Sequence, residues 1–199
     1  MRRSDAGFKT TSPTLMWWIL AMVAFTEVQS RSQAGLDAVV GRVRLLIYAD
    51  APRLPYVRAI INEVLRWRPA GRLGVPHVMA MDGWYDGMFI PKGVTCIANI
   101  WRCNRDRTVF GDDADEFTPE RHPGDSCELI PGRKETSSEG HLSFGFGRRI
   151  CVGKHLENGS LFIHTARILC AATLKCAQDE NGWKLRPDTN AFVDVGVIR

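Results

Sequence analysis

Apolar residues recur at helical spacing in the first third of the chain. Residues 14–33 begin with the apolar run Leu15–Phe25 and become polar towards the end, which predicts one long helix. The spacing over Leu36–Val43 predicts a second, shorter helix. Tyr56–Trp67 carries apolar residues three and four apart and predicts a third. This third helix should end before Pro69, because a residue that precedes proline avoids the helical conformation.

The middle and the tail of the chain have the pattern of strands and turns. Val75–Met81 and Met88–Trp101 are predicted strands on either side of the turn signal DGWYDG. Asn104–Cys127 is rich in turn residues, and Glu128–Gly140 is a polar loop. The tail, Trp183–Ile198, indicates a short hairpin.

A last long helix is expected from Cys151 onwards. Apolar and small residues follow one another there in alternating steps of four and three, which is typical of a buried helix face. The predicted buried residues are Val152, Leu156, Gly159, Ile163, Ala166 and Cys170. Together these patterns predict a mainly α fold with small β-sheets, an α+β arrangement in which helices dominate.

Composition narrows the function classes. The 199 residues are enough for one domain with a sizeable core, and the hydrophobic content of 45% is typical of a globular protein. The formal net charge is +4, but Lys and Arg are scattered rather than gathered in a stripe, so we expect no nucleic-acid partner. A basic docking face for an acidic protein remains open.

The N-terminus resembles a signal peptide, because basic residues precede the apolar run Leu15–Phe25. The run is shorter than the about 20 residues that a membrane span needs. Polar residues follow it without a cleavage site of small residues. We therefore expect a core helix and no membrane anchor in this chain.

The six cysteines do not form a C-x-x-C pair, so the sequence does not indicate a structural zinc site. Their even count leaves open a secreted protein with a disulfide framework. Reduced thiols are the default expectation, because the chain is not short and the cysteine spacing is loose.

The stretch SFGFGRRICVG, residues 143–153, surrounds Cys151 with glycines, phenylalanines and arginines. A lone cysteine before a helix is often a small buried residue. A phosphate loop does not fit, because Arg148 stands where that motif needs glycine and His155 follows Lys154. A nucleophilic cysteine would need a base, and no Cys-x-His group lies nearby in the sequence.

The hypothesis of a thiolate ligand to haem iron gives a reason for every residue type in this stretch. Glycines let backbone amides approach the sulfur, and the following helix directs its positive end towards it. Phe144 can shield the sulfur from water, and Arg149 can reach a haem propionate as a charge-assisted pair. Thiolate ligation increases electron density on the iron and favours cleavage of the O–O bond.

This stretch resembles the cytochrome P450 signature F-x-x-G-x-R-x-C-x-G through Phe144, Gly147, Arg149, Cys151 and Gly153. The resemblance implies heme b (iron protoporphyrin IX) with Cys151 as its axial thiolate ligand. It also implies that Arg149 is a propionate partner.

Two further motifs follow the same family pattern. Glu63 and Arg66 form an E-x-x-R pair, and Arg121 ends a P-E-R motif, while His122 replaces the usual aromatic neighbour. Alone, the E-x-x-R pair would be an ordinary surface ion pair. The resemblance implies a triad of Glu63, Arg66 and Arg121 that locks the meander beneath the haem.

The resemblance also covers the N-terminal residues. Ala6–Leu15 is similar to the oxygen-binding kink of the distal helix, with Thr10 on the threonine that helps to deliver protons. Lys9 occupies the position where the family has an acid. His77 is expected to meet a haem propionate. Pro69–Val75 and residues 191–193 correspond to segments that face the substrate.

The implied function is haem-thiolate monooxygenation of a small hydrophobic organic substrate, of secondary-metabolite or xenobiotic type, with molecular oxygen. NADPH-cytochrome P450 reductase is the expected electron donor, with a basic face of Arg148, Lys154 and Lys134. The alternative is a non-catalytic fragment that keeps only the haem cradle.

The amino-acid sequence of the motifs resembles that of the fungal microsomal branch of the family. Full-length members of this branch are expected at the endoplasmic reticulum membrane. Residues 1–199 are accordingly expected to be the C-terminal, haem-binding part of a P450 domain, without the anchor and the substrate-recognition half. We then expect Leu15–Phe25 to expose an apolar patch, because its usual covering segments are absent.

Overall fold

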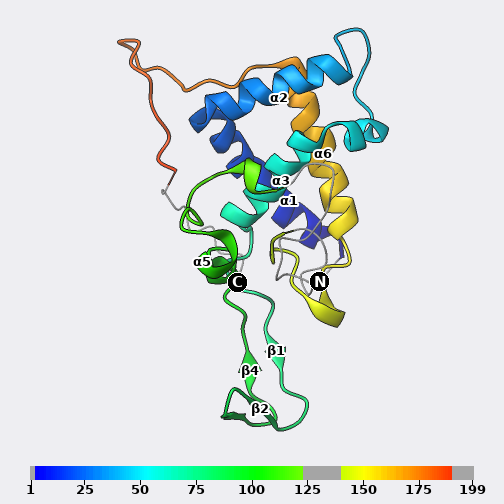
Figure 1. Ribbon diagram of the computed structural model, residues 1–199, viewed down its shortest axis with the longest axis vertical. Coiled ribbons are helices and arrows are strands. Elements are labelled where there is room, and N and C mark those ends of the chain that lie inside the picture. The colour runs from blue at the N-terminus through cyan, green and yellow to red at the C-terminus, as the bar shows by residue number, and fades with distance from the viewer. Residues whose placement is uncertain (1–2, 123–139, 190–199) are drawn as a thin grey trace.

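The computed structural model describes residues 3–122 and 140–189, with the backbone alone over residues 3–9. Helices are the dominant elements of the described structure, and two small sheets and several short turns of helix complete it (Figure 1). The main helices are α1 (Arg3–Ala24), α2 (Thr26–Val39), α3 (Pro55–Trp67) and α6 (Lys154–Ala171). The shorter elements are η1 (Tyr48–Arg53), β1 (His77–Val78), β2 (Gly83–Tyr85), β3 (Met88–Ile90), β4 (Thr95–Cys96), α4 (Ile100–Cys103), α5 (Arg107–Phe110), η2 (Pro119–Arg121) and η3 (Gly147–Arg149). The predicted mainly α fold with small β-sheets is confirmed.

Helices α1 and α2 replace the single helix predicted over residues 14–33. The break falls at Phe25, whose backbone leaves the helical region at φ −111° and ψ 72°. Phe25 stacks on Phe117 with 4.9 Å between ring centroids and meets the Trp67 ring edge-on. The separate helix predicted over Leu36–Val43 is wrong, since α2 runs through its first half and ends at Val39.

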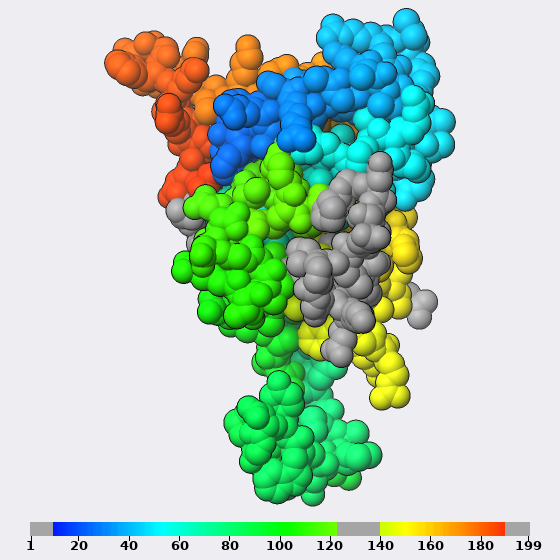
Figure 2. All heavy atoms as spheres, in the orientation of Figure 1, coloured from blue at the N-terminus to red at the C-terminus, as the bar shows by residue number. Residues whose placement is uncertain are grey.

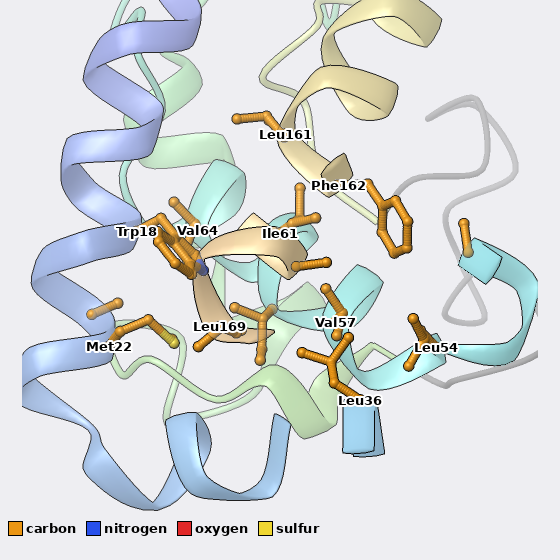
Figure 3. Packing of buried hydrophobic residues seen from close by; sticks show 14 of the residues in the cluster. Trp18, Met22, Leu36, Leu54, Val57, Ile61, Val64, Leu161, Phe162 and Leu169 are labelled. Atoms are coloured by element: carbon orange, nitrogen blue, oxygen red, sulfur yellow. The ribbon is translucent and has the colours of Figure 1, made fainter. Parts of the chain in front are cut away.

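The core lies where α1, α2, α3 and α6 pack together (Figure 3). The apolar run of α1 is part of this core, as predicted, because Trp18 and Met22 are fully buried. The expectation that this run exposes its large side chains is therefore wrong for Trp18 and Met22. Met16 and Ile19 do remain exposed on the opposite side of the helix.

Helix α3 agrees with its prediction within one residue at its start. It begins with Pro55 in its first turn, where the missing amide hydrogen costs nothing, and ends at Trp67. Its buried apolar residues are Val57, Ala59, Ile60, Ile61, Val64, Leu65 and Trp67. Glu63 and Arg66 are buried in the same helix, which is unusual for charged side chains.

The predicted strands are present but short. β1 pairs with β4 and β2 pairs with β3, both antiparallel, and the four strands form an arm that projects from the helices (Figure 1). The tip is a two-residue turn at Asp86 and Gly87, both with positive φ, which suits a tight hairpin. The strand predicted up to Trp101 is wrong at its end, where residues 100–103 form α4.

The buried face of α6 differs from the predicted one. The buried residues are Leu161, Phe162, Thr165, Ala166 and Leu169. Of the predicted stripe, Val152, Leu156 and Cys170 are exposed and Ala166 alone is fully buried. The helix carries apolar side chains on several sides, and its contacts with α1, α2 and α3 select the face that is buried.

The described part of the tail forms a turn earlier than the predicted hairpin. Gln178 and Lys184 form an isolated antiparallel bridge, and the Leu185 amide donates to the Ala177 carbonyl at 2.8 Å. Most of the hairpin predicted for Trp183–Ile198 lies outside the described residues. Within the part of the chain that is described, none of the helices has the length and apolar character needed to cross a membrane.

Candidate functional site

The loop around Cys151 is held by its own backbone. The Cys151 amide donates to the Phe144 carbonyl at 2.8 Å, so the loop closes on itself. Gly145 and Gly147 have φ of +73° and +61°, values that an L side chain rarely adopts. These two glycines let the chain turn twice within seven residues and deliver Cys151 to the start of α6.

A buried asparagine ties this loop to the helical core. Asn104 follows α4, and its side chain accepts from the Leu142 amide at 2.8 Å and donates to Ser143 Oγ at 3.1 Å. Ser143 Oγ in turn donates to the Leu65 carbonyl of α3 at 2.6 Å. The start of the loop is thus fixed to α3 and α4. Nothing in the sequence marks Asn104, the C-cap of α4, as a site residue, because residues 100–103 have the pattern of a strand.

The Glu63 carboxylate is the centre of a buried ionic cluster, as the E-x-x-R and P-E-R motifs implied. Its Oε1 lies 2.7 Å from an Arg66 nitrogen and 3.1 Å from Arg121 Nε. Its Oε2 lies 2.8 Å from Arg66 Nε and 2.9 Å from His122 Nε2. His122, which sequence analysis treated as a mild departure, is therefore a fourth member of the cluster.

Burial raises the pKa of Glu63, but its hydrogen bonds with Arg66 and His122 lower it more, to about 2. The carboxylate is fully buried and stays ionised at neutral pH because each of its oxygens has cationic or donor partners. The Thr118 amide also donates to Oε1, at 2.8 Å.

The two arginines of the cluster hold the turn-rich segment that follows α4. Arg66 donates to the carbonyls of Asn104, Ala114 and Glu116 at 2.6–2.8 Å. Arg121 donates to the Phe110 and Asp113 carbonyls, both at 2.9 Å. Residues 104–122 are therefore wrapped around the end of α3 by charge-assisted hydrogen bonds. Since Asn104 also anchors the Cys151 loop, the cluster and the loop form one connected framework.

A second group of cations lies at the C-terminal end of α3. The Arg68 guanidinium lies 3.8 Å from the Trp67 ring centroid, and that of Arg105 lies 3.3 Å from the Trp101 centroid. Burial, and to a smaller extent the charge of neighbouring arginines, lowers the pKa of both arginines to about 10. The sequence gives no sign of this group, because its members lie on different elements that only the fold brings together.

The signature residues lie together on one loop. Phe144 is half-buried against the core, and a Cβ added at Gly153 would lie 3.7 Å from Cys151 Sγ. The side chains of Cys151 and Arg149 are exposed. The predicted ligand and its neighbours are thus brought together at the surface of the helical body.

Two predicted site residues lie elsewhere. His77 is exposed on β1 and pairs through its backbone with Cys96 of β4. The described hydrogen bonds that anchor the start of the Cys151 loop are made with Asn104 and Leu65, and none of these involves His77. Thr10 is exposed on α1, where its carbonyl accepts from Thr14 Oγ1 at 3.0 Å. The substrate-facing tip at residues 191–193 and the basic residue Lys134 lie outside the described residues.

The chemistry around Cys151 fits a haem-thiolate site. A free thiol sits at the start of an 18-residue helix. Phe146, Val152 and Leu156, large apolar side chains close to it in sequence, are also exposed. Exposed apolar side chains next to a thiol are expected where a flat apolar macrocycle packs. The residues present would therefore suit iron protoporphyrin IX.

Comparison with known proteins identifies one family. The cytochrome P450 family profile matches residues 5–193. A cytochrome P450 monooxygenase of Armillaria gallica is 48% identical over 193 residues, which are 97% of this chain and 37% of that protein. Cytochrome P450 monooxygenase 253 of Postia placenta is 43% identical over 196 residues, or 36% of its length. The chain thus spans little more than a third of the length of these relatives.

Solved structures show the same fold. A zebra fish cytochrome P450 with progesterone superimposes with a TM-score of 0.77 and 34% identity, over 88% of this chain and 38% of that one. A second zebra fish P450 structure, with abiraterone, gives a TM-score of 0.72 over 83% of this chain.

Proposed function

The chain belongs to the cytochrome P450 family, and on that premise we propose that the protein is a haem-thiolate monooxygenase. The observation that carries this proposal is the exposed Cys151 thiol, presented at the start of α6 by a loop anchored to α3.

Each residue of the loop has a role that follows from its place. Cys151 would hold the iron of heme b through its thiolate. Gly145 and Gly147 shape the loop, and Phe144 excludes water from the core side of the thiol. Arg149 would bind a haem propionate by a charge-assisted hydrogen bond. His77, which lies on β1 outside the loop, is proposed as a second propionate partner on the family resemblance alone. Heme b, when bound, supplies the centre at which one atom of dioxygen is transferred to the substrate and the other leaves as water.

Thr10 is proposed to hold a proton at its Oγ1 on the distal side of the site. A hydroxyl can accept one hydrogen bond and donate another, so it can orient a water molecule without carrying charge. Lys9 stands at the neighbouring position where the family resemblance implies an acid. Lysine, with an ordinary pKa of about 10.4, holds its proton too tightly at neutral pH to replace a carboxylic acid as a proton donor.

A basic hollow supports the proposed partnership with NADPH-cytochrome P450 reductase. The hollow has a volume of about 370 Å³ and lies between η1, α3 and α6. Arg58, Lys154 and His155 are among its lining residues. Arg148, on the Cys151 loop, is exposed as well. Positive charge close to the proposed ligand would attract an acidic electron-transfer protein.

The substrate is proposed to be a small hydrophobic organic molecule, of secondary-metabolite or xenobiotic type. The zebra fish relatives with progesterone and abiraterone support an organic substrate. For the longest natural form of the protein we propose the endoplasmic reticulum membrane, by the resemblance to the fungal microsomal branch.

The test is reductase-supported turnover in the longest natural form of the protein. We expect oxygen consumption and an oxidised product when NADPH, the reductase and a hydrophobic substrate panel are present. Thr10→Ala should divert electrons to peroxide, with the matched change Thr26→Ala, in the first turn of α2, as control. Haem binding without any oxygen consumption would contradict the monooxygenase and favour the non-catalytic haem cradle.

A further inference from the structure

One side-chain hydrogen bond connects the helix of Thr10 to the helix that follows Cys151. Thr11 Oγ1, on α1, donates to Glu157 Oε2, on α6, across 146 positions of sequence. Glu157 lies in the first turn of α6, six residues after Cys151. Thr11 directly follows Thr10. The bond therefore joins the helical turn that contains Thr10, the threonine proposed to assist oxygen activation, to the helix that follows Cys151, the proposed iron ligand.

Glu157 is a carboxyl group in an uncommon setting. Its side chain is half-buried, and burial raises its pKa, while the Thr11 hydrogen bond acts in the opposite direction. Of the α1 side chains that the structure describes, those of residues 10–24, none is ionisable. The other ionisable groups on the elements packed against α6 and on α6 itself are Glu27, Arg31 and Asp37 of α2, Tyr48, Asp50 and Arg53 of η1, Tyr56, Arg58, Glu63 and Arg66 of α3, and Lys154, His155, His164, Arg167 and Cys170 of α6.

We propose that Glu157 is the positioning residue of the Thr10–Thr11 pair, fixing this turn of α1 against α6 through its hydrogen bond to Thr11. This inference rests on the proposed function for Thr10 and assigns a further residue to the same site. Sequence analysis did not single out Glu157, because the bond depends on two helices that lie 146 residues apart in the chain.

The bond persists in both protonation states of the carboxyl group, but its direction changes. Ionised Glu157 accepts the Thr11 hydroxyl hydrogen, as in the observed geometry. Protonated Glu157 can donate its own hydrogen to Thr11 Oγ1, which frees the Thr11 hydroxyl to donate elsewhere. The change takes up one proton from solvent, and that proton stays on the Glu157 carboxyl group. The protonation of Glu157 thus decides what the turn beside Thr10 can donate.

The lysine at position 9 makes the hydrogen bond between Thr11 and Glu157 more important. The family resemblance implies an acid directly before the threonine, and this chain has a lysine there. Glu157 brings a carboxyl group to the next threonine from a different helix. The site therefore keeps an acidic partner for its threonine pair, although not at the position that the sequence motif specifies.

The test compares Glu157→Gln and Glu157→Ala with the exposed control Glu27→Gln, in the haem-loaded longest natural form of the protein. Glutamine keeps an acceptor for Thr11 but cannot ionise, whereas alanine removes the bond. Backbone hydrogen exchange in residues 10–14 should accelerate on the order of 2- to 10-fold in Glu157→Ala, the net worth of one hydrogen bond, and stay unchanged in Glu157→Gln. Equal exchange in all variants would overturn the positioning role.

The pH profile gives a second readout. The folded-state pKa of Glu157 is raised, so its stabilising contribution is complete below the unfolded value of 4.5 and is lost as pH rises through the folded value. The thermal unfolding midpoint of the wild type should therefore fall as pH rises over this range, and that of Glu157→Gln should fall less. A parallel profile for the two proteins would contradict the assignment.

The carbon monoxide spectrum separates this inference from the proposed function. All Glu157 variants should keep the red-shifted Soret band of a thiolate-ligated haem, since Glu157 is not a ligand. A wild type that lacks this band refutes the proposed function, whatever the exchange data show. A normal band with unchanged exchange refutes only the role of Glu157.

Discussion

At the scale of single residues, Glu63 shows how a buried charge is tolerated in this fold. Arg66, Arg121, His122 and the Thr118 amide together satisfy both oxygens of its carboxylate. Removing one member of a buried ion pair is costly, because the remaining charges stay buried without compensation. His122 shares this role, which the motif comparison could not show, since the family has an aromatic residue there.

Glu63→Gln should destabilise the protein by about 3–5 kcal/mol, because Arg66 and Arg121 then lack their counter-charge. The matched control is Glu120→Gln. Glu120 pairs with Arg31 at the surface at 2.8 Å, where such pairs are worth about 0–1 kcal/mol. Urea unfolding of both variants measures the difference. Similar losses for the two would show that the buried cluster has no special importance.

The pKa of Glu63 also predicts the response to acid. Because its folded-state pKa is depressed to about 2, its stabilising contribution is present above the unfolded value of 4.5 and disappears as pH falls towards 2. Wild-type stability should therefore decline steeply between pH 4.5 and 2, and less steeply in Glu63→Gln. Thermal unfolding midpoints at stepped pH test this, and a wild type with a flat profile over that range is incompatible with it.

At the scale of elements, the Cys151 loop depends on glycines in the left-handed region. Gly147 has φ +61°, where a Cβ costs about 1–2 kcal/mol. Gly147→Ala should lower stability by that amount. Gly153→Ala is the control in the same loop, since Gly153 has φ −84° and an added Cβ would meet only Cys151 Sγ at 3.7 Å. If both changes lower the thermal midpoint equally, left-handed strain is not the cause.

The elements also show where sequence patterns suffice. Helix α3 was predictable because its apolar residues keep one face over three turns and Pro69 limits its end. The break at Phe25 was not, because it depends on the Phe25 ring stacking on Phe117, far along the chain. Periodicity alone also could not choose the buried face of α6. Local propensity was overridden by tertiary packing in both places.

The candidate site also has a part that the sequence predicts and a part that it does not. The loop of Phe144, Gly147, Arg149, Cys151 and Gly153 was predictable, because these residues are close in sequence and each type has a chemical reason. Asn104 and Glu157 were not, because each acts through a contact with a distant element. Long-range contacts of this kind leave no periodic signal in a single sequence.

At the scale of the whole molecule, the arm of β1–β4 projects from the helical body as a separate lobe (Figure 2). Its tip carries the large apolar side chains Trp84, Tyr85, Met88 and Phe89, all at least 50% exposed. Clustered exposed apolar side chains of this kind favour association.

Residues 1–199 expressed alone should therefore self-associate through this tip. Replacing Trp84 and Phe89 together by serine should shift the population towards the monomer in size-exclusion chromatography. Trp183→Ser is the control, because Trp183 is equally large and 75% exposed but lies in the tail. If the double variant elutes like the wild type, the arm is not the surface that associates.

The central claim is that Cys151 ligates haem iron, and the spectrum of the ferrous carbon monoxide adduct tests it most directly. The wild-type protein in its longest natural form should show the red-shifted Soret band of a thiolate-ligated haem. Cys151→Ser should abolish this band, whereas Cys170→Ser, which removes another exposed thiol, should leave it in place. A red-shifted band that survives in Cys151→Ser would contradict the account.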